Sequence, residues 1–417
     1  MKLKDTNETF ATSLKGAGIR ATMGGDPEFF VADGKGKILA SDKFFPGKEK
    51  PIKFIGAAAT ERAYGILKLF FDGIQAEMNI GVQQCREGAT FNVHTCLQKA
   101  INIIEKENKD CQIILKPAVK VTKAVIKSAD PEARRFGCMP DFNAYTLTTN
   151  TDEIDATNHP YRYAGGHIHL GVSSPYVKRS SKEGKMAKTE EGHLRIIRLL
   201  DLIVGIPCVL LDNSAEAKIR RAEYGKAGCF RPTPYGVEYR TPSCWWIKSP
   251  TTVSLILGLA RLAWTIAGKS QDLKLFNLLN CKPADVRGII DESDRKVAVE
   301  LWEKVRPYIA IIGRAYNNPL HIRTVRSPDV VFGPERWSER SGEFIKVKGS
   351  AVFSLAVFEY MVKNGLESLI SDNVKKEWKL NTKGFNSMNG FVNEMHKRLF
   401  KDKDFMNFQN DFLKQII

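Results

Sequence analysis

The stretch YRYAGGHIHLGV, residues 161–172, decides the fold expected of this chain. His167 and His169 stand two apart, between a glycine pair and a further glycine, in a sequence with only seven histidines. In a β-strand, side chains two apart point to the same face, so both imidazoles share one face while Ile168 and Leu170 point toward a core. The stretch therefore predicts a strand whose polar face carries a function.

Three other predicted strands carry polar side chains with the same period of two. These are Asp26 and Glu28 in DPEFF, Glu77 between Gln75 and Asn79 in DGIQAEMNI, and Glu238 with Arg240 in YGVEYR. A single cluster of this kind is more often a solvated strand face, and a lone pair of histidines is more often hydrogen-bonded than bound to metal. Four clusters in one chain instead describe one polar sheet face with ligands for hard cations.

The order of predicted elements indicates an α+β protein. Strands are predicted within 20–41, as a hairpin around DGKG, and at 73–80, 111–119, 142–149, 164–172 and 237–243. Helices are predicted at 89–107, from the end of a polar loop (178–192) to about 211, at 251–268, and from about 285 onward apart from a basic segment at 318–348. Strands precede helices without regular β–α–β alternation, which favours a curved, mainly antiparallel sheet with flanking helices.

The composition bounds the class of protein. Of 417 residues, 43% are hydrophobic and 26% are charged, which is typical of a globular chain. The net charge of +16 attracts polyanions such as nucleic acid or acidic peptides, although a basic surface can also serve solubility alone. The eight cysteines form no CxxC pair, which indicates buried thiols in a reducing compartment. The apolar stretches contain charged residues, so we expect buried helices, no membrane span and a cytoplasmic protein.

The segment AKIRRAEYGKAGCFRPTPYGVEYR, residues 217–240, indicates an anionic substrate. It brings four arginines close to Glu238 along the chain: Arg220, Arg221, Arg231 and Arg240. Guanidinium groups bind phosphate and carboxylate with two parallel hydrogen bonds, although surface arginines in a basic protein would give the same composition. Carboxylates with few imidazoles suit Mg²⁺ or Mn²⁺, which mostly serve phosphate chemistry in proteins. The sequence lacks GxxxxGK[ST], GxGxxG and GxSxG, so a nucleotide would be held on the sheet face through metals.

The ordered set of DPEFF, DGIQAEMNI, GGHIHLG, RRAEYGKAGCFR and YGVEYRTPS resembles the phage-type carboxylate-amine ligases, amidoligases of the glutamine-synthetase-like superfamily. The matching segments span about residues 20–250. The resemblance implies a glutamine-synthetase-like sheet whose concave face holds ATP and Mg²⁺ or Mn²⁺ ions. It also implies that ATP phosphorylates a substrate carboxylate and that an amine then displaces phosphate to give an amide. We expect a ligase domain over 1–315 and a mainly helical C-terminal extension over 316–417.

The resemblance also implies residue roles. The metal ligands would be Asp26, Glu28, Glu77, His167 and Glu238. Contacts to ATP would come from His169, Arg231, Arg240 and Arg220, and the groups acting in catalysis would be Arg240, Arg231, His169 and Arg221. Two departures from glutamine synthetase stand out: Asp26 replaces a glutamate, and Leu69 stands where that enzyme has a carboxylate. Either Asp72 substitutes for the missing carboxylate or the metal site is simpler.

Two other readings stay open at this point. The same side chains would serve a metal-dependent hydrolase or phosphotransferase, and a chain on this scaffold could be a non-catalytic nucleic-acid-binding protein. As a ligase, the protein would take a carboxylate and an amine, one of which could be a polyanion, and it could form a homo-oligomer. If it is encoded by a phage, the compartment would be the host cytoplasm.

Overall fold

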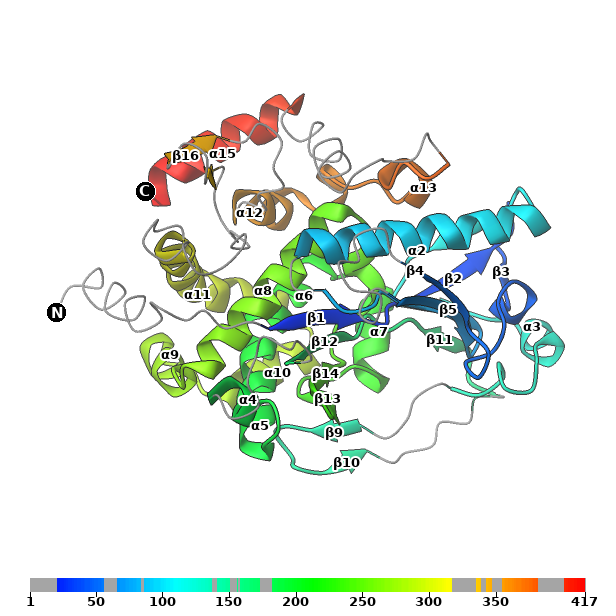
Figure 1. Ribbon diagram of the computed structural model, residues 1–417, viewed down its shortest axis with the longest axis horizontal. Coiled ribbons are helices and arrows are strands. Elements are labelled where there is room, and N and C mark those ends of the chain that lie inside the picture. Colours follow the sequence, from blue (N-terminus) through cyan, green and yellow to red (C-terminus); the bar gives the residue numbers. More distant parts are fainter. Residues whose placement is uncertain are drawn as a thin grey trace.

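Two antiparallel sheets form the centre of the computed structural model (Figure 1), which describes residues 21–55, 66–83, 86–136, 141–150, 156, 158–172, 182–316, 335–338, 343–346, 355–381 and 401–416. The first sheet has the order β1 (Thr22–Gly25), β12 (Ile168–Gly171), β14 (Gly236–Tyr239), β13 (Cys229–Thr233), β9 (Asp141–Asn143) and β10 (Thr149–Asn150). The second has the order β3 (Ile38–Leu39), β2 (Glu28–Ala32), β6 (Gln75–Asn79), β5 (Ile66–Asp72) and β4 (Ile52–Ile55), with β7 (Gln112–Ile114) beside β2.

The two sheets meet where β1 runs into β2, at Asp26 and Pro27. Here the backbone N–H of Ile80 donates to the carbonyl of Gly25 (3.0 Å), and that of Met78 donates to the carbonyl of Pro27 (3.1 Å). The end of β6 and the residue after it therefore hold both sheets together, and the sheet surface curls across this point. The predicted α+β class with a curved, mainly antiparallel sheet is confirmed.

Helices pack on the sheets and against one another (Figure 1). The long ones are α2 (Arg86–Glu107), α8 (Pro250–Gly268) and α11 (Arg295–Tyr316). Around them lie α5 (Glu190–Leu200), the π-helix η2 (Asp201–Gly205), α6 (Ile206–Leu211), α7 (Ala215–Glu223), α9 (Asp272–Leu279) and α10 (Pro283–Asp291). Short elements are η1 (Ser41–Lys43), α3 (Lys123–Ser128), α4 (Lys182–Met186), η3 (Cys244–Ile247) and a separate pair of strands, β8 (Ala118–Lys120) with β11 (Tyr161–Tyr163).

Helix α8 is the core helix that the sequence predicted at 251–268. Ser249 caps it by accepting a hydrogen bond from the N–H of Thr251, and Pro250 occupies the first turn, where no backbone N–H partner is needed. The helix is long and apolar enough to cross a membrane, but 94% of its most apolar window is buried inside the protein. It thus serves as core. The six cysteines within the described residues are free thiols, as predicted; Cys85 and Cys138 lie outside those residues.

Three predicted elements differ in the structure. Residues 142–149 form not one strand but the end of β9, the start of β10 and the turn between them, because the side-chain oxygen of Asn143 accepts the N–H groups of Tyr145 and Thr146. Residues 111–119 divide into β7 and β8. The polar segment 178–192 contains α4, since its lysines and glutamates favour a helix as readily as a loop. Strands β4, β5 and β13 were not predicted.

Within the described part of the C-terminal segment, residues 355–381 pack on the core, as does Phe405. The segment contains a strand pair, β15 (Glu335–Ser338) with β16 (Glu343–Lys346), and the helices α12 (Leu355–Asn364), η5 (Leu366–Ser368), α13 (Val374–Glu377) and α15 (Lys403–Ile416). Trp378 is fully buried, and its indole N–H donates to the carbonyl of Ile247 (2.9 Å). The indole N–H of Trp302 in α11 donates to Glu359 in α12 (2.7 Å). The division into domains at residue 315 stays a prediction.

Replacing Trp378 with Ala is expected to destabilise the whole protein by about 3–5 kcal/mol, because it empties a buried site and leaves a carbonyl unpaired. A single denaturant transition, shifted to lower midpoint, would follow. If residues 316–417 unfolded independently, the main transition would keep its midpoint and only a separate, smaller one would move.

Candidate functional site

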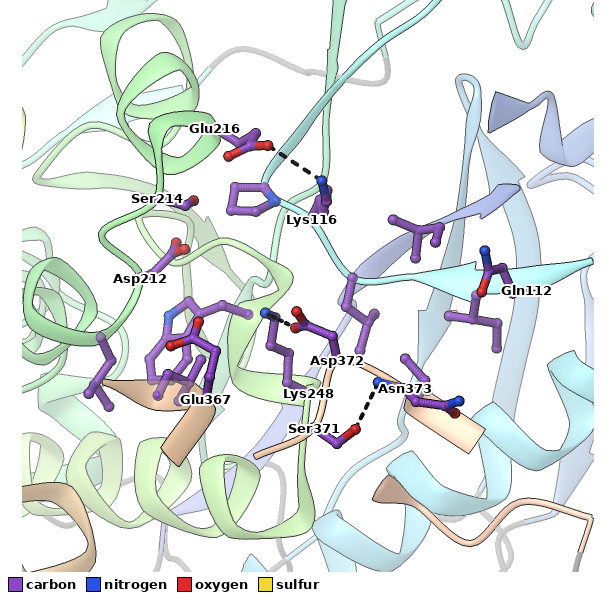
Figure 2. A pocket seen from close by; sticks show the side chains of 18 of the residues that line it. Gln112, Lys116, Asp212, Ser214, Glu216, Lys248, Glu367, Ser371, Asp372 and Asn373 are labelled. Atoms are coloured by element: carbon purple, nitrogen blue, oxygen red, sulfur yellow. Dashed lines mark hydrogen bonds and ion pairs between the residues drawn. The ribbon is translucent and has the colours of Figure 1, made fainter. Parts of the chain in front are cut away.

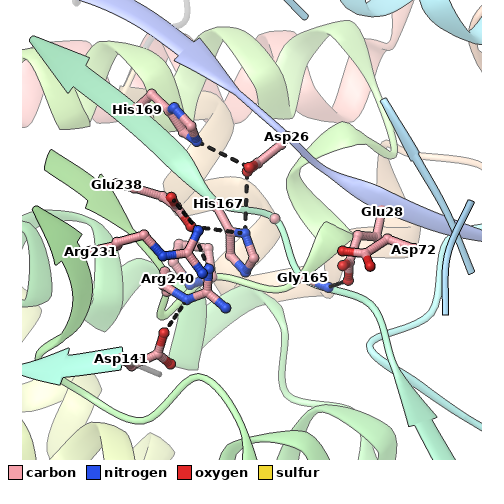
Figure 3. Close-up of polar contacts among 12 residues, drawn as sticks. Asp26, Glu28, Asp72, Asp141, Gly165, His167, His169, Arg231, Glu238 and Arg240 are labelled. Atoms are coloured by element: carbon pink, nitrogen blue, oxygen red, sulfur yellow. Dashed lines mark hydrogen bonds and ion pairs between the residues drawn. The ribbon is translucent and has the colours of Figure 1, made fainter. Parts of the chain in front are cut away.

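A row of polar side chains crosses the first sheet. In the strand register, His169 lies opposite Gly24 on one side and Glu238 on the other, and Glu238 lies opposite Arg231. Residues directly across from one another share a face of the sheet, so the imidazole, carboxylate and guanidinium stand side by side. Gly24 has no side chain, and a Cβ there would stand 2.7 Å from the carbonyl oxygen of Gly81, so backbone fills that end of the row. Asp26 lies close to both His167 and His169 (Figure 3).

Asp26 lies between the two imidazoles. Its Oδ1 is 3.2 Å from Nδ1 of His167 and its Oδ2 is 3.2 Å from Nε2 of His169. Burial alone would raise the pKa of Asp26, but the two histidines hold it well below its usual range. Asp26, His169 and Glu238 offer ligand atoms that all lie within 4.8 Å of one another. Among the described residues, Asp26 Oδ1 and His169 Nε2 have no hydrogen-bond partner of good geometry, which fits a cation held between them.

His167 reaches the same carboxylates from the neighbouring position. Its Nδ1 lies 3.6 Å from Oε1 of Glu238 as well as close to Asp26, while its Nε2 is 2.7 Å from the hydroxyl of Tyr224. We expected one histidine at the metal and the other at phosphate, and this division of roles stays a prediction. The structure brings both imidazoles within 3.2 Å of Asp26.

A second acidic cluster lies on the other sheet. Glu28 of β2 and Glu77 of β6 are directly opposite, and Asp72 of β5 completes a group whose ligand atoms lie within 4.8 Å of one another. Burial, with the nearby carboxylates, raises the pKa of Glu28 to about 8 and raises that of Glu77 well above its usual range. Buried carboxyl groups that face each other hold their protons unless a cation stabilises the ionised forms. The chemistry of three carboxylates fits Mg²⁺ or Mn²⁺.

The position of Asp72 bears on the alternative left open for this cluster, because Asp72 lies where it could substitute for the missing carboxylate. Leu69 is fully buried in the core, because alternate residues of β5 point to opposite faces. Asp72 points to the same face as Glu77 and supplies the third carboxylate. The ammonium of Lys48 lies 3.9 Å from Asp72. Partial burial lowers the pKa of Lys48, but Glu77 and Asp72 outweigh it and raise that pKa.

The glycine pair before His167 allows the backbone to approach these groups. A Cβ on Gly166 would stand 2.1 Å from the carbonyl of Ser243, and one on Gly165 would stand 2.5 Å from Nε2 of His167. The N–H of Gly165 donates to Glu28. Any larger residue would displace the strand, which explains in physical terms why glycines stand here.

Arg231 and Arg240 both contact Glu238. Arg231 donates to Oε2 (3.0 Å) from the edge of the site, where about a third of its side chain is exposed. Arg240 is buried and donates to Oε1, while its Nε pairs with Asp141 and its Nη2 donates to Tyr224 (2.9 Å). The two guanidinium groups thus surround the carboxylate of the first cluster, as Figure 3 shows.

The structure does not bring Arg220 and Arg221 into this group. Successive residues of a helix point about 100° apart, and in α7 neither of the two arginines faces the row. Arg220 is buried and donates to the carbonyls of Thr241 (2.8 Å), Arg240 and Pro242. Arg221 is buried, forms an ion pair with Asp212 (3.7 Å) and donates a hydrogen bond to the hydroxyl of Ser293 (2.9 Å). In the structure both hold the backbone and the helices behind the site. The expected roles of Arg220 in ATP contact and of Arg221 in catalysis gain no support from these contacts and stay predictions.

Several residues at the site were not predicted from sequence: Asp141, Tyr224, Tyr235 and Lys48. Tyr224 and Tyr235 stand within the arginine segment. The hydroxyl of Tyr224 lies 2.7 Å from Nε2 of His167, and that of Tyr235 lies 2.7 Å from Nδ1 of His169. Asp141 pairs with Arg240 from β9, a strand far away in sequence. No period or spacing signal linked these residues to the four motifs, because tertiary pairing alone joins them.

A pocket of about 520 Å³ lies elsewhere, between β7, the start of α7 and the C-terminal segment (Figure 2). Its walls include Trp245 and Leu366, and two ion pairs cross it: Lys248 with Asp372 (2.8 Å) and Lys116 with Glu216 (3.5 Å). Within the described part of the chain, the residues lining it include none of the predicted site residues. The candidate site is therefore the polar sheet face and not this pocket.

Replacing Asp72 with Asn is expected to weaken Mn²⁺ binding at the second cluster about 10-fold or more, because a carboxylate ligand and its charge are lost. Counting bound Mn²⁺ by electron paramagnetic resonance should then give one tight ion, where two are expected for the unaltered protein. The matched control is Asp110→Asn, at an exposed turn. Unchanged Mn²⁺ binding in Asp72→Asn would contradict the assignment.

Comparison with known proteins supports the resemblance seen in the motifs. Residues 187–303 match the family model for the phage phiEco32-like COOH.NH2 ligase-type 2. This segment contains Arg231, Glu238 and Arg240, and the chain is thus similar to carboxylate-amine ligases. Among curated proteins, none matches. A solved structure described as a novel glutamine synthase homolog aligns with 74% of this chain and 71% of its own, at 12% identity and a TM-score of 0.29, which is too distant to support an argument.

Proposed function

We propose that this protein, which resembles the phage-type carboxylate-amine ligases over residues 187–303, joins a carboxylate and an amine at the expense of ATP. The proposal rests on two clusters of side chains that could each hold a cation. These are Asp26–His169–Glu238 and Glu28–Asp72–Glu77, on one curled sheet face. Two such clusters beside two arginines suit the transfer of a phosphoryl group.

In this proposal, each cluster holds one Mg²⁺ or Mn²⁺ ion. The ions would neutralise the phosphate oxygens of ATP. The substrate carboxylate oxygen forms a bond to the γ-phosphorus, and the bond from that phosphorus to the oxygen of ADP breaks. The amine nitrogen then bonds to the acyl carbon and phosphate leaves, with loss of one proton from nitrogen.

The residues of this chain have distinct tasks in these steps. Arg231, on the edge of the site and partly exposed, donates to the transferred phosphoryl group. Arg240, buried and fixed by Asp141, stabilises the charge of Glu238 and of the phosphoryl group. Lys48 stands beside the second cluster and is placed to contact the incoming carboxylate.

Calorimetric titration with a non-hydrolysable ATP analogue tests the proposal first. Binding in the presence of Mg²⁺ that disappears on chelation supports it, and no binding under either condition contradicts it. With binding established, acid and amine pairs are screened for phosphate release. A ligase releases ADP and phosphate only when both substrates are present, whereas a hydrolase or phosphotransferase needs no amine.

Oxygen labelling tests the chemical step. A carboxylate labelled with ¹⁸O should pass one labelled oxygen to the released phosphate, because the acyl carbon loses the oxygen bonded to phosphorus. Unlabelled phosphate would contradict an acyl-phosphate intermediate. The polyanionic partner, the homo-oligomer and the cytoplasmic location stay proposals, and the first is tested by the salt dependence of nucleic-acid binding.

A further inference from the structure

Tyr224 connects the arginine segment to the first cluster. It follows α7 directly, and its hydroxyl stands 2.7 Å from Nε2 of His167 and accepts a hydrogen bond from Nη2 of Arg240 (2.9 Å). The residue is 8% exposed, so water competes little for either contact. The hydroxyl is therefore hydrogen-bonded to one of the two ring nitrogens of His167.

This hydrogen bond determines which nitrogen of His167 is left to face the carboxylates. With Nε2 held by Tyr224, Nδ1 is the atom that faces the carboxylates of Asp26 (3.2 Å) and Glu238 (3.6 Å). A phenol can both donate and accept, so it accepts from Nε2–H whenever Nδ1 offers its lone pair to a cation. Ligand histidines in metal sites commonly have their second nitrogen fixed in this way.

The ring of Tyr224 is itself held rigidly. The guanidinium carbon of Arg220 lies 4.8 Å from its centroid, and Tyr163 stacks beside it at 6.4 Å with an interplanar angle of 21°. Arg220 is in turn fixed by three backbone carbonyls. Gly225 follows with φ of 77°, and a Cβ there would stand 2.3 Å from Arg220 Nη1. The turn thus needs glycine to keep Arg220 against the ring.

We propose that Tyr224 is a positioning residue that acts through His167 and directs Nδ1 of that histidine toward the cation bound with Asp26 and Glu238. The inference rests on the proposed function, because it concerns the cation that this function requires. It assigns a use to the arginine segment that differs from phosphate contact: Arg220 supports the ring of Tyr224, and the hydroxyl supports the histidine.

The test measures binding of Mn²⁺ alone to the full chain by electron paramagnetic resonance. Tyr224→Phe keeps the ring and its contacts but removes the hydroxyl, and it should weaken one Mn²⁺ site about 10- to 100-fold while leaving the other unchanged. The visible absorption of bound Co²⁺ should also change at that site, which a purely structural role would not cause. The matched control is Tyr163→Phe, whose hydroxyl contacts Glu223 and not His167; it should leave both sites unchanged.

A double-mutant cycle with His167→Ala separates a role through the histidine from a role through Arg240. In the His167→Ala background, Tyr224→Phe should cause no further loss of Mn²⁺ affinity. An equally large loss in that background would overturn the inference, and so would an unchanged affinity and Co²⁺ spectrum in Tyr224→Phe alone. Absence of Mn²⁺ binding to the unaltered protein would instead remove the proposed function, and this inference with it.

Discussion

Glu238→Gln is expected to remove metal-dependent binding of the ATP analogue and to lower ligase turnover about 1,000-fold or more, because one carboxylate serves the cation and both arginines. Glu238 offers a ligand atom to the first cluster and accepts hydrogen bonds from Arg231 and Arg240. Gln keeps the shape and one acceptor oxygen, so the fold should persist. The negative charge that holds the two guanidinium groups and the cation together is lost.

Asp141→Asn is the matched control for this prediction. Asp141 also pairs with Arg240, yet it is not part of either cation cluster. Its replacement should reduce turnover by loosening Arg240 while Mn²⁺ binding stays close to that of the unaltered protein. If Glu238→Gln bound Mn²⁺ and the analogue as tightly as the unaltered protein, the first cluster would not be the metal site. Circular dichroism and thermal midpoints would confirm that both variants fold.

Glu28→Gln is expected to stabilise the metal-free protein at high pH and to destabilise it relative to the unaltered protein when Mg²⁺ is present. Burial, with Asp72, raises the pKa of Glu28 from about 4.5 to about 8. Below about pH 4.5 the carboxyl is protonated in both the folded and the unfolded chain and contributes nothing. Between these two values only the unfolded chain ionises, so the free energy of unfolding falls as pH rises, and above pH 8 the loss is complete.

The amide of Gln avoids that ionisation. The metal-free variant should therefore exceed the unaltered protein in unfolding free energy by on the order of 5 kcal/mol at pH 9, with no difference near pH 4. Added Mg²⁺ should raise the thermal midpoint of the unaltered protein through binding to the folded state, and should raise that of the variant far less. Thermal melts at both pH values, with and without chelator, measure both effects.

The exposed Glu107 on α2 supplies the control, because Glu107→Gln alters the charge of the chain equally without touching the cluster. Its stability should follow that of the unaltered protein at each pH and each Mg²⁺ concentration. If Glu28→Gln behaved in the same way, Glu28 would not be a buried carboxylate at a cation site.

The period of two in four short motifs was enough to predict which side chains come together on the curled sheet face. Glu28, Glu77, His169 and Glu238 lie in its strands, where alternation sets the direction of their side chains, and Asp26, His167 and Arg240 directly adjoin strand ends. The α+β class and the core helix α8 followed from the same kind of pattern. These features depend on residues near one another in sequence, so local periodicity is enough to predict them.

Only the tertiary structure decided which of these side chains lie close enough together to hold a cation and which arginines face them. Sequence gives the spacing of Arg220, Arg221 and Arg231 but not their direction: α7 turns the first two toward backbone and helices, and β13 places the third beside Glu238. The register between distant strands likewise brought Asp72, Asp141 and Tyr224 to the site. The physical reason is that alternation fixes a face within one strand, whereas pairing between strands is set by long-range hydrogen bonds and core packing.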